Sequence, residues 1–203
     1  MKEKRRALRA QMTRAGLHAA AVKVITREGP EGLTMDRVAE EAGLAKGTLY
    51  LYFKNKQDLV ESTVQASMMP LVEELHVLLD GPLAPEEKLR RLPLVHMGYF
   101  EKHRDFYRIL LYERNTVQAQ CRRRKATRYQ TFLEKLAGVI RQGIRSGAFR
   151  SMDADNVAAM LAEASIAMIH HRLRTERPGS LKADAALVAE VFLKGMTSKE
   201  NRP

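Results

Sequence analysis

The sequence predicts an all-α protein of about nine helices, with a three-helix, helix-turn-helix head at the N-terminus and a larger helical body behind it. Apolar residues recur at helical spacing along most of the chain, and no segment shows the alternation of a strand or an internal repeat. Gly and Pro pairs at 29–30, 81–82 and 178–179 separate the helical stretches. We therefore expect a head at 1–54 and a body at 55–203.

Composition limits the classes of function. The chain has 203 residues and a formal net charge of +11, and a basic surplus of this size favours nucleic acid, a membrane surface or acidic ligands as partners. Its single Cys excludes an internal disulfide framework. Because no run of about 18 apolar residues is present and the charged N-terminus lacks a signal sequence, we expect a cytoplasmic protein without a membrane partner.

The first helix is expected to begin at Lys2 or Lys4 and to end at Arg27. Its apolar residues at helical spacing are Leu8, Met12, Ala15, Ala19 and Val22. Residues 1–6 form a basic segment. Such a segment could reach into a minor groove, or it could be a flexible end that keeps the protein soluble.

Two short helices follow, joined by a tight turn. Met35, Val38, Ala39 and Ala42 have the spacing of one buried helical face, and Thr34 is a suitable N-cap before them. Gly43 occupies the C′ position, where glycine adopts a left-handed backbone at no steric cost. The next helix should run from Ala45 to Phe53, with Leu49 and Phe53 facing inward. This is a helix-turn-helix pattern.

The outward side of the second helix is suited to DNA. It carries hydroxyl and ammonium donors for phosphates and base edges, a Gly that permits close approach, and no acidic residue from 43 to 57. A solvated helical hairpin is the alternative interpretation. The candidate DNA-binding residues are Thr34, Lys46, Gly47, Thr48, Tyr50, Tyr52 and Lys56.

The segment TMDRVAEEAGLAKGTLYLYFKNKQDLV resembles the DNA-binding segment of TetR-type bacterial regulators, and LHAAAVKVITREG resembles their first helix. The resemblance is specific over residues 10–60. Ala45 stands where Ser is usual, so a helix cap is missing, and Ile25 stands where Phe is common. The resemblance implies a regulator that dimerises through its last two helices and holds an effector in its body.

The body is expected to contain six helices. Helix-stop signals at Gly and Pro and caps at Asp and Ser bound them. Pro70 is expected to kink the first of them or to end one segment of it, and Pro93 is expected to kink the second. One helix is expected to begin at Pro85 and to carry apolar residues as far as Phe100. The other expected ranges are 55–79, 105–112, 117–146, 153–174 and 180–196.

Small residues on the last two helices would permit close packing against a second copy of the chain, although ordinary core packing is the alternative. The candidate dimer-interface residues are Ala164, Met168, Ala185, Val188, Ala189 and Phe192. Met and aromatic side chains would suit an apolar ligand, and again core packing is the alternative. The candidate pocket residues are Met97, Phe100, Tyr107, Tyr129, Phe132 and Met160.

Other reactive side chains give weaker signals. Cys121 precedes the basic run at 122–125, which could lower its thiol pKa, hold a phosphate-bearing effector or be a solvated face. His96, His103, His170 and His171 lack the spacing of metal ligands, and no catalytic motif is present. We expect no catalytic residues, metal or cofactor.

The sequence therefore predicts a DNA-binding transcriptional regulator and not an enzyme. We expect a homodimeric repressor that binds double-stranded DNA at a palindromic operator and is released by a small apolar or amphipathic effector. The alternative is a helical lipid- or small-molecule-binding module, or an enzyme, that carries a non-functional helix-turn-helix.

Overall fold

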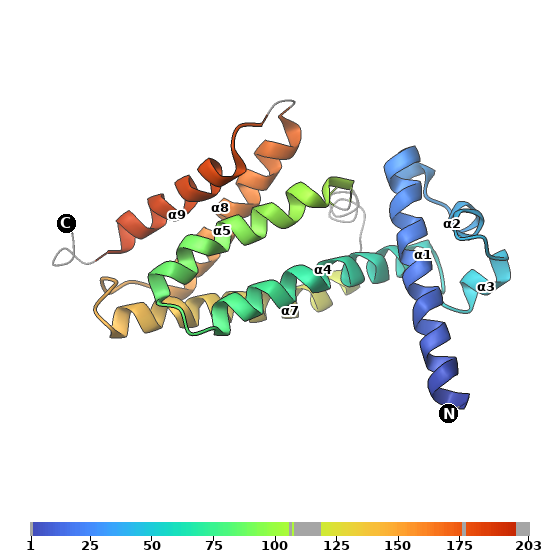
Figure 1. The fold of residues 1–203 in the computed structure, drawn as a ribbon, viewed down its shortest axis with the longest axis horizontal. Coiled ribbons are helices and arrows are strands. Elements are labelled where there is room, and N and C mark those ends of the chain that lie inside the picture. Colours follow the sequence, from blue (N-terminus) through green and yellow to red (C-terminus); the bar gives the residue numbers. More distant parts are fainter. Residues whose placement is uncertain (1, 106, 108–118, 176–177, 198–203) are drawn as a thin grey trace. The chain divides into compact units, whose positions relative to one another are not determined.

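The computed structural model describes residues 2–105, 107, 119–175 and 178–197 (Figure 1). Within these ranges the chain forms eight α-helices, and its only bridge between extended residues joins Phe149 to Thr197. The all-α prediction is confirmed. The helices are α1 (Lys2–Gly32), α2 (Met35–Glu41), α3 (Lys46–Tyr50), α4 (Lys56–Asp80), α5 (Pro85–Lys102), α7 (Ala119–Arg145), α8 (Ala154–Arg174) and α9 (Leu181–Met196).

Packing divides the chain into two units. The first unit comprises residues 1–69 and 103–121, and the second comprises residues 70–102 and 122–203. The boundary between the two units falls within α4, at Pro70, although the helix itself continues through this residue. The functional boundary that we placed between residues 54 and 55 stays a prediction.

In the first unit, the C-terminal half of α1 packs against the rest of the unit, whereas its N-terminal half is mostly exposed. Leu17, Ala20, Ala21, Val24 and Ile25 are buried, whereas Leu8 and Met12 are 57% and 67% exposed. The spacing of Leu8 and Met12 thus predicted the helix correctly but gave no buried face. The regular helix ends at Gly29, where φ is 75°, and a further turn continues to Gly32.

The core of the first unit forms around Phe53. This ring is 1% exposed, its centroid lies 5.5 Å from that of His18, and the Arg14 guanidinium carbon lies 5.4 Å from it. Burial, with a smaller contribution from the Arg14 charge, lowers the pKa of His18, and the His18 Nε2 lies 3.0 Å from the Ser62 hydroxyl. Phe53, which follows α3, therefore packs against α1, and His18 connects α1 to α4 through Ser62.

In the second unit, α5, α8 and α9 pack together around a buried cation. Arg172 on α8 is 4% exposed, and its guanidinium contacts Asp184 of α9, the Gly179 carbonyl at 2.9 Å and Glu101 of α5 at 3.4 Å. These contacts supply the partners that a buried charge requires.

Some helix bounds differ from the predictions, and others agree with them. α3 ends at Tyr50 rather than Phe53, because the chain turns at Leu51 and Tyr52 before Phe53 enters the core. Pro85 begins α5, as expected, and α5 continues through Pro93 to Lys102. The helix expected at 105–112 falls largely outside the described residues.

Candidate nucleic-acid interface

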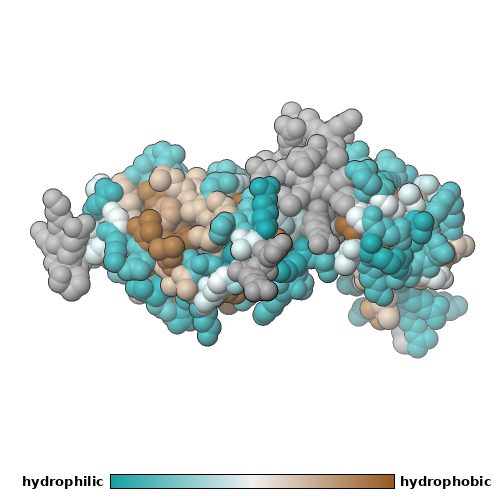
Figure 2. Space-filling view, turned by 90° about the horizontal axis from the view of Figure 1, so that it is seen from above, coloured by the Kyte–Doolittle hydropathy of each residue, from teal (hydrophilic) through white to brown (hydrophobic). Residues whose placement is uncertain are grey.

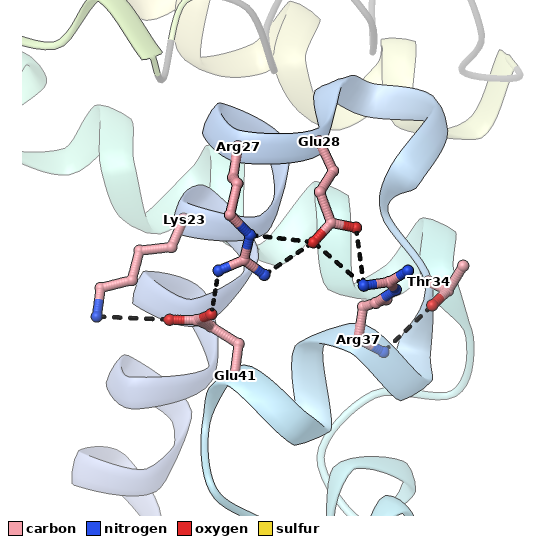
Figure 3. Close-up of polar contacts among 6 residues, drawn as sticks. All are labelled: Lys23, Arg27, Glu28, Thr34, Arg37 and Glu41. Carbon is pink, nitrogen blue, oxygen red and sulfur yellow. Dashed lines mark hydrogen bonds and ion pairs between the residues drawn. The ribbon is translucent and has the colours of Figure 1, made fainter.

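A network of ion pairs fixes α2 against the end of α1 (Figure 3). Arg27 Nη1 lies 2.8 Å from Glu41, and Arg27 Nη2 lies 2.8 Å from Glu28. Glu28 also lies 3.5 Å from Arg37, and Glu41 lies 3.7 Å from Lys23. The hydrogen bond from Arg27 lowers the pKa of the Glu41 carboxyl. The network thereby restricts the angle between α1 and α2.

The turn between α2 and α3 has the geometry of a Schellman motif. The Gly43 N–H donates to the Glu40 carbonyl at 3.0 Å, and the Leu44 N–H donates to the Ala39 carbonyl at 2.9 Å. Gly43 has φ 66°, a conformation that glycine adopts without strain. The turn predicted from Gly43 is therefore present.

On α3, the predicted hydrogen-bond donors lie on either side of a glycine, Gly47, whose backbone is uncovered. Lys46, Gly47 and Tyr50 are exposed, Thr48 is half-buried, and Leu49 is buried in the core of the first unit. A Cβ built on Gly47 would meet no atom within 4 Å, so the fold itself does not require glycine there. A requirement for glycine would therefore have to come from an external partner that approaches the backbone.

Lys46 is paired with a residue that the sequence did not indicate. Its Nζ lies 2.6 Å from an Asp36 carboxylate oxygen, and both side chains are more than half exposed. The hydrogen bond to Asp36 raises the pKa of Lys46. The ammonium is thus positioned at the start of α3, and a phosphate or base edge would compete with Asp36 for it.

The remaining predicted contact residues flank α3. The exposed Thr34 caps α2, with its hydroxyl accepting from the Arg37 N–H at 3.2 Å. Tyr52 is half-buried in the turn after α3, and Lys56 is half-buried at the first position of α4. The roles of all seven predicted DNA-binding residues remain predictions.

Aromatic residues gather inside the second unit around His96. The His96 ring lies 5.7 Å from Phe100 and 6.4 Å from Phe132, and Tyr129 lies 6.3 Å from Phe132. His96 is buried, its Nδ1 has no hydrogen-bond partner in the described structure, and burial lowers its pKa to about 4. The sequence placed His96 on the apolar face of this helix and indicated a metal ligand only weakly; its lack of a hydrogen-bond partner is a tertiary property that the sequence does not show.

The predicted pocket residues have different environments. Met97 and Phe100 are buried in the second unit, and Phe132 is half-buried. Tyr129 is partly exposed and donates to Glu163 at 2.6 Å, whereas Met160 is 61% exposed on α8. Tyr107 is buried in the first unit. Met160 therefore does not lie in the buried core, and the pocket as a whole stays a prediction.

The predicted dimer residues lie on two faces. Ala185, Val188 and Ala189 are buried within the chain, where they offer almost no surface to a partner. Ala164, Met168 and Phe192 are half-buried. Hydrophobic side chains gather on the face of the second unit that Figure 2 shows, and the exposed large hydrophobic residues of α8 and α9 are Met160, Leu187 and Val191.

Other possible sites are limited. In the ranges that the structure describes, no group of three or more His, Cys, Asp or Glu residues is arranged to hold a metal ion. No helix among the described residues is both long and apolar enough to cross a membrane. The side chains of Cys121 and residues 122–125 lie outside those described, so their roles stay hypotheses.

Two family models match the chain. The model described as "Bacterial regulatory proteins, tetR family" matches residues 9–63, which include α2, α3 and the turn between them. The model described as "Tetracyclin repressor-like, C-terminal domain" matches residues 82–170. The first match covers every candidate DNA-binding residue, and the second covers α5, α7 and most of α8.

Two named regulators are similar to this chain. The fatty acid metabolism regulator protein of Bacillus subtilis is 28% identical over 128 residues, which is 63% of this chain and 66% of that protein, just under two thirds of its length. The transcriptional repressor NicS of Pseudomonas putida is 27% identical over 187 residues, covering 89% of this chain and 86% of NicS.

A solved structure shares the fold. The transcriptional regulator FadR of Bacillus subtilis, in complex with stearoyl-CoA, is 24% identical and superposes with a TM-score of 0.79 over 89% of this chain and 98% of that one. The helix-turn-helix and these similarities define a DNA-binding transcriptional regulator rather than an enzyme. The chain belongs to the TetR family.

Proposed function

We propose that this protein is a homodimeric repressor whose two α3 helices enter successive major grooves of a palindromic operator. The exposed face of α3 carries this proposal, because it combines Lys46 and Tyr50 with the unobstructed backbone of Gly47. Two-fold symmetry would place the recognition helices one helical turn apart, about 34–36 Å. The name of the NicS repressor supports the direction of regulation.

The second unit supports an apolar effector. Buried Met97 and Phe100 supply an apolar surface, and the neutral His96 supplies one polar atom that has no partner among the described residues. An apolar site with a few polar groups is typical of small-molecule pockets. The similar Bacillus proteins are a fatty acid metabolism regulator and a stearoyl-CoA complex, so we propose an effector that contains an acyl chain.

Dimerisation would use the exposed side of α8 and α9. Leu187 and Val191 are one turn apart on α9 and more than half exposed, and Met160, Ala164 and Met168 recur at the same interval on α8. These apolar stripes replace the buried residues Ala185, Val188 and Ala189 in our proposed interface. A second copy of the chain would remove both stripes from water.

Selection from a library of random duplexes tests the DNA-binding part of the proposal. We expect the wild-type protein to enrich two inverted half-sites whose centres are about one helical turn apart. Enrichment of no sequence, or of a single unpaired half-site, would contradict it.

A second assay tests the effector with the selected duplex. Acyl-CoAs and free fatty acids of increasing chain length should raise the Tm and release the DNA, whereas CoA alone should do neither. An effector can shift the equilibrium only by its difference in affinity between the two states. Acyl compounds that raise the Tm without releasing DNA would contradict release as the mechanism.

A further inference from the structure

A basic cleft lies between the N-terminal part of α1 and the end of α3. Its volume is about 660 Å³, and one wall consists of Lys2, Arg5, Arg6 and Arg9 with Ala10. These cations are spaced at i, i+3, i+4 and i+7, which places them on one helical face. The other wall consists of Leu51 and Tyr52, directly after Tyr50 of α3.

The four cations face the solvent. Lys2 through Arg9 are all exposed, and among the described residues no carboxylate forms an ion pair with any of the four. Figure 1 shows this end of α1 extending past α2 and α3. The first buried residue of α1 is Leu17, so this part of the helix contributes almost nothing to the core.

We propose that this cleft binds the sugar–phosphate backbone of duplex DNA beside the base pairs that α3 reads. The inference rests on the proposed function and adds to it a second, sequence-independent contact made by α1. Because Leu51 and Tyr52 follow Tyr50 immediately, a duplex against α3 continues past the mouth of the cleft. The DNA backbone is a regular row of negative charges, and four positively charged side chains line the cleft.

The chemistry of the lining fits a phosphodiester strand. Guanidinium groups bind phosphate oxygens through paired N–H donors, and three of the four cations are arginines. The Tyr52 hydroxyl adds a further donor, and the apolar edge of Leu51 can pack against deoxyribose. Contacts of this kind position a protein on DNA and carry no sequence information directly.

Salt dependence of binding to long random-sequence duplex DNA tests the proposal. Arg5→Ala and Arg9→Ala each remove one cation from the cleft. Lys4→Ala is the matched control, since it removes one charge from the same turns of α1 but does not line the cleft. Circular dichroism should show the same helix content in all three, because the three side chains are exposed.

We expect each Arg variant to reduce the slope of log K against log salt by about one unit, because one phosphate is no longer neutralised, whereas Lys4→Ala keeps the wild-type slope. Hydroxyl-radical footprints on the selected duplex should no longer show protection of the flanking backbone but should still show protection of the half-sites. Arg variants with the slope and footprint of Lys4→Ala would overturn the inference.

The same data separate this inference from the proposed function. A wild-type protein that binds random DNA but enriches no sequence contradicts the proposed function, while the slopes still decide the role of the cleft. A wild-type protein that binds no duplex overturns both.

Discussion

At the scale of single residues, Ala45 leaves the N-terminus of α3 without a side-chain cap. It is the N-cap of α3 and makes no side-chain hydrogen bond to the helix. Thr34, by contrast, caps α2 with its hydroxyl. The N–H groups of the first turn of α3 therefore lack the acceptor that a Ser or Thr would provide.

Ala45→Ser should stabilise the first unit by about 1 kcal/mol, because the new hydroxyl can accept from the exposed N–H groups of α3. Urea unfolding measures the change. Ala42→Ser is the control, since Ala42 is the C-cap of α2, where an added acceptor meets no free N–H. Equal unfolding free energies for the two variants would contradict this account of the cap.

Sequence reasoning succeeded where the determinants were close in the chain. Gly43 and Ala45 act on the helix end next to them, so their roles were predictable. The pair between Lys46 and Asp36 spans ten positions and depends on the angle between α2 and α3. Hydrophobic periodicity does not specify the angle between two helices, so the sequence alone could not predict this ion pair.

At the scale of helices, α7 is packed against the turn that follows it. A Cβ on Gly143 would lie 2.2 Å from the nearest ring carbon of Phe149, which is 2% exposed. On the same helix, a Cβ on Gly138 would meet no atom within 4 Å. The two glycines therefore form a matched pair.

Gly143→Ala should destabilise the second unit by about 1–3 kcal/mol, because the buried ring must move. Gly138→Ala should instead be neutral or stabilise it by up to about 1 kcal/mol through helix propensity. Thermal unfolding of both variants checks this pair of predictions. Gly143→Ala that unfolds at or above the wild-type Tm would show that the ring moves freely.

His96 on α5 should make stability depend on pH. Burial lowers its pKa from 6.5 to about 4, so the unfolded chain binds more protons than the folded one between these values. The contribution of His96 to the free energy of unfolding is therefore complete above pH 6.5, and it declines by about 3 kcal/mol as the pH falls to 4.

The neutral variant His96→Gln isolates this effect. The stability difference between wild type and variant, measured by urea unfolding, should shift against the wild type as the pH falls from 6.5 to 4. Parallel pH profiles would contradict the buried, neutral assignment. His18 and His170, whose pKa values are also lowered by burial, are present in both proteins and cancel.

Helix positions were more predictable than helix faces. The Asp153 and Ser180 caps begin α8 and α9 as the sequence indicated. On α1, however, Leu8 and Met12 have the spacing of a core face and are exposed, because the head packs only against the second half of this long helix. Which face of a helix is covered depends on its neighbours, and a single helix does not specify them.

At the scale of the whole molecule, assembly should depend on the exposed side of α9. Val191→Glu places a charge on the exposed stripe and should give folded monomers in light scattering with unchanged circular dichroism. Ala189→Glu is two positions away but buried, so it should unfold the second unit, because an unpaired buried charge is costly. A Val191→Glu protein that remains dimeric would contradict the proposed interface.

The central claim is that α3 reads base sequence while residues around it bind phosphate, and a comparison of three variants on two DNAs tests it most directly. Lys46→Ala and Tyr50→Ala should each lose about 1–3 kcal/mol more on the selected operator than on random DNA. Lys56→Ala, at the start of α4, should weaken both equally and reduce the salt slope by about one unit. Equal losses on both DNAs for all three variants would contradict the assignment of α3 as the recognition helix.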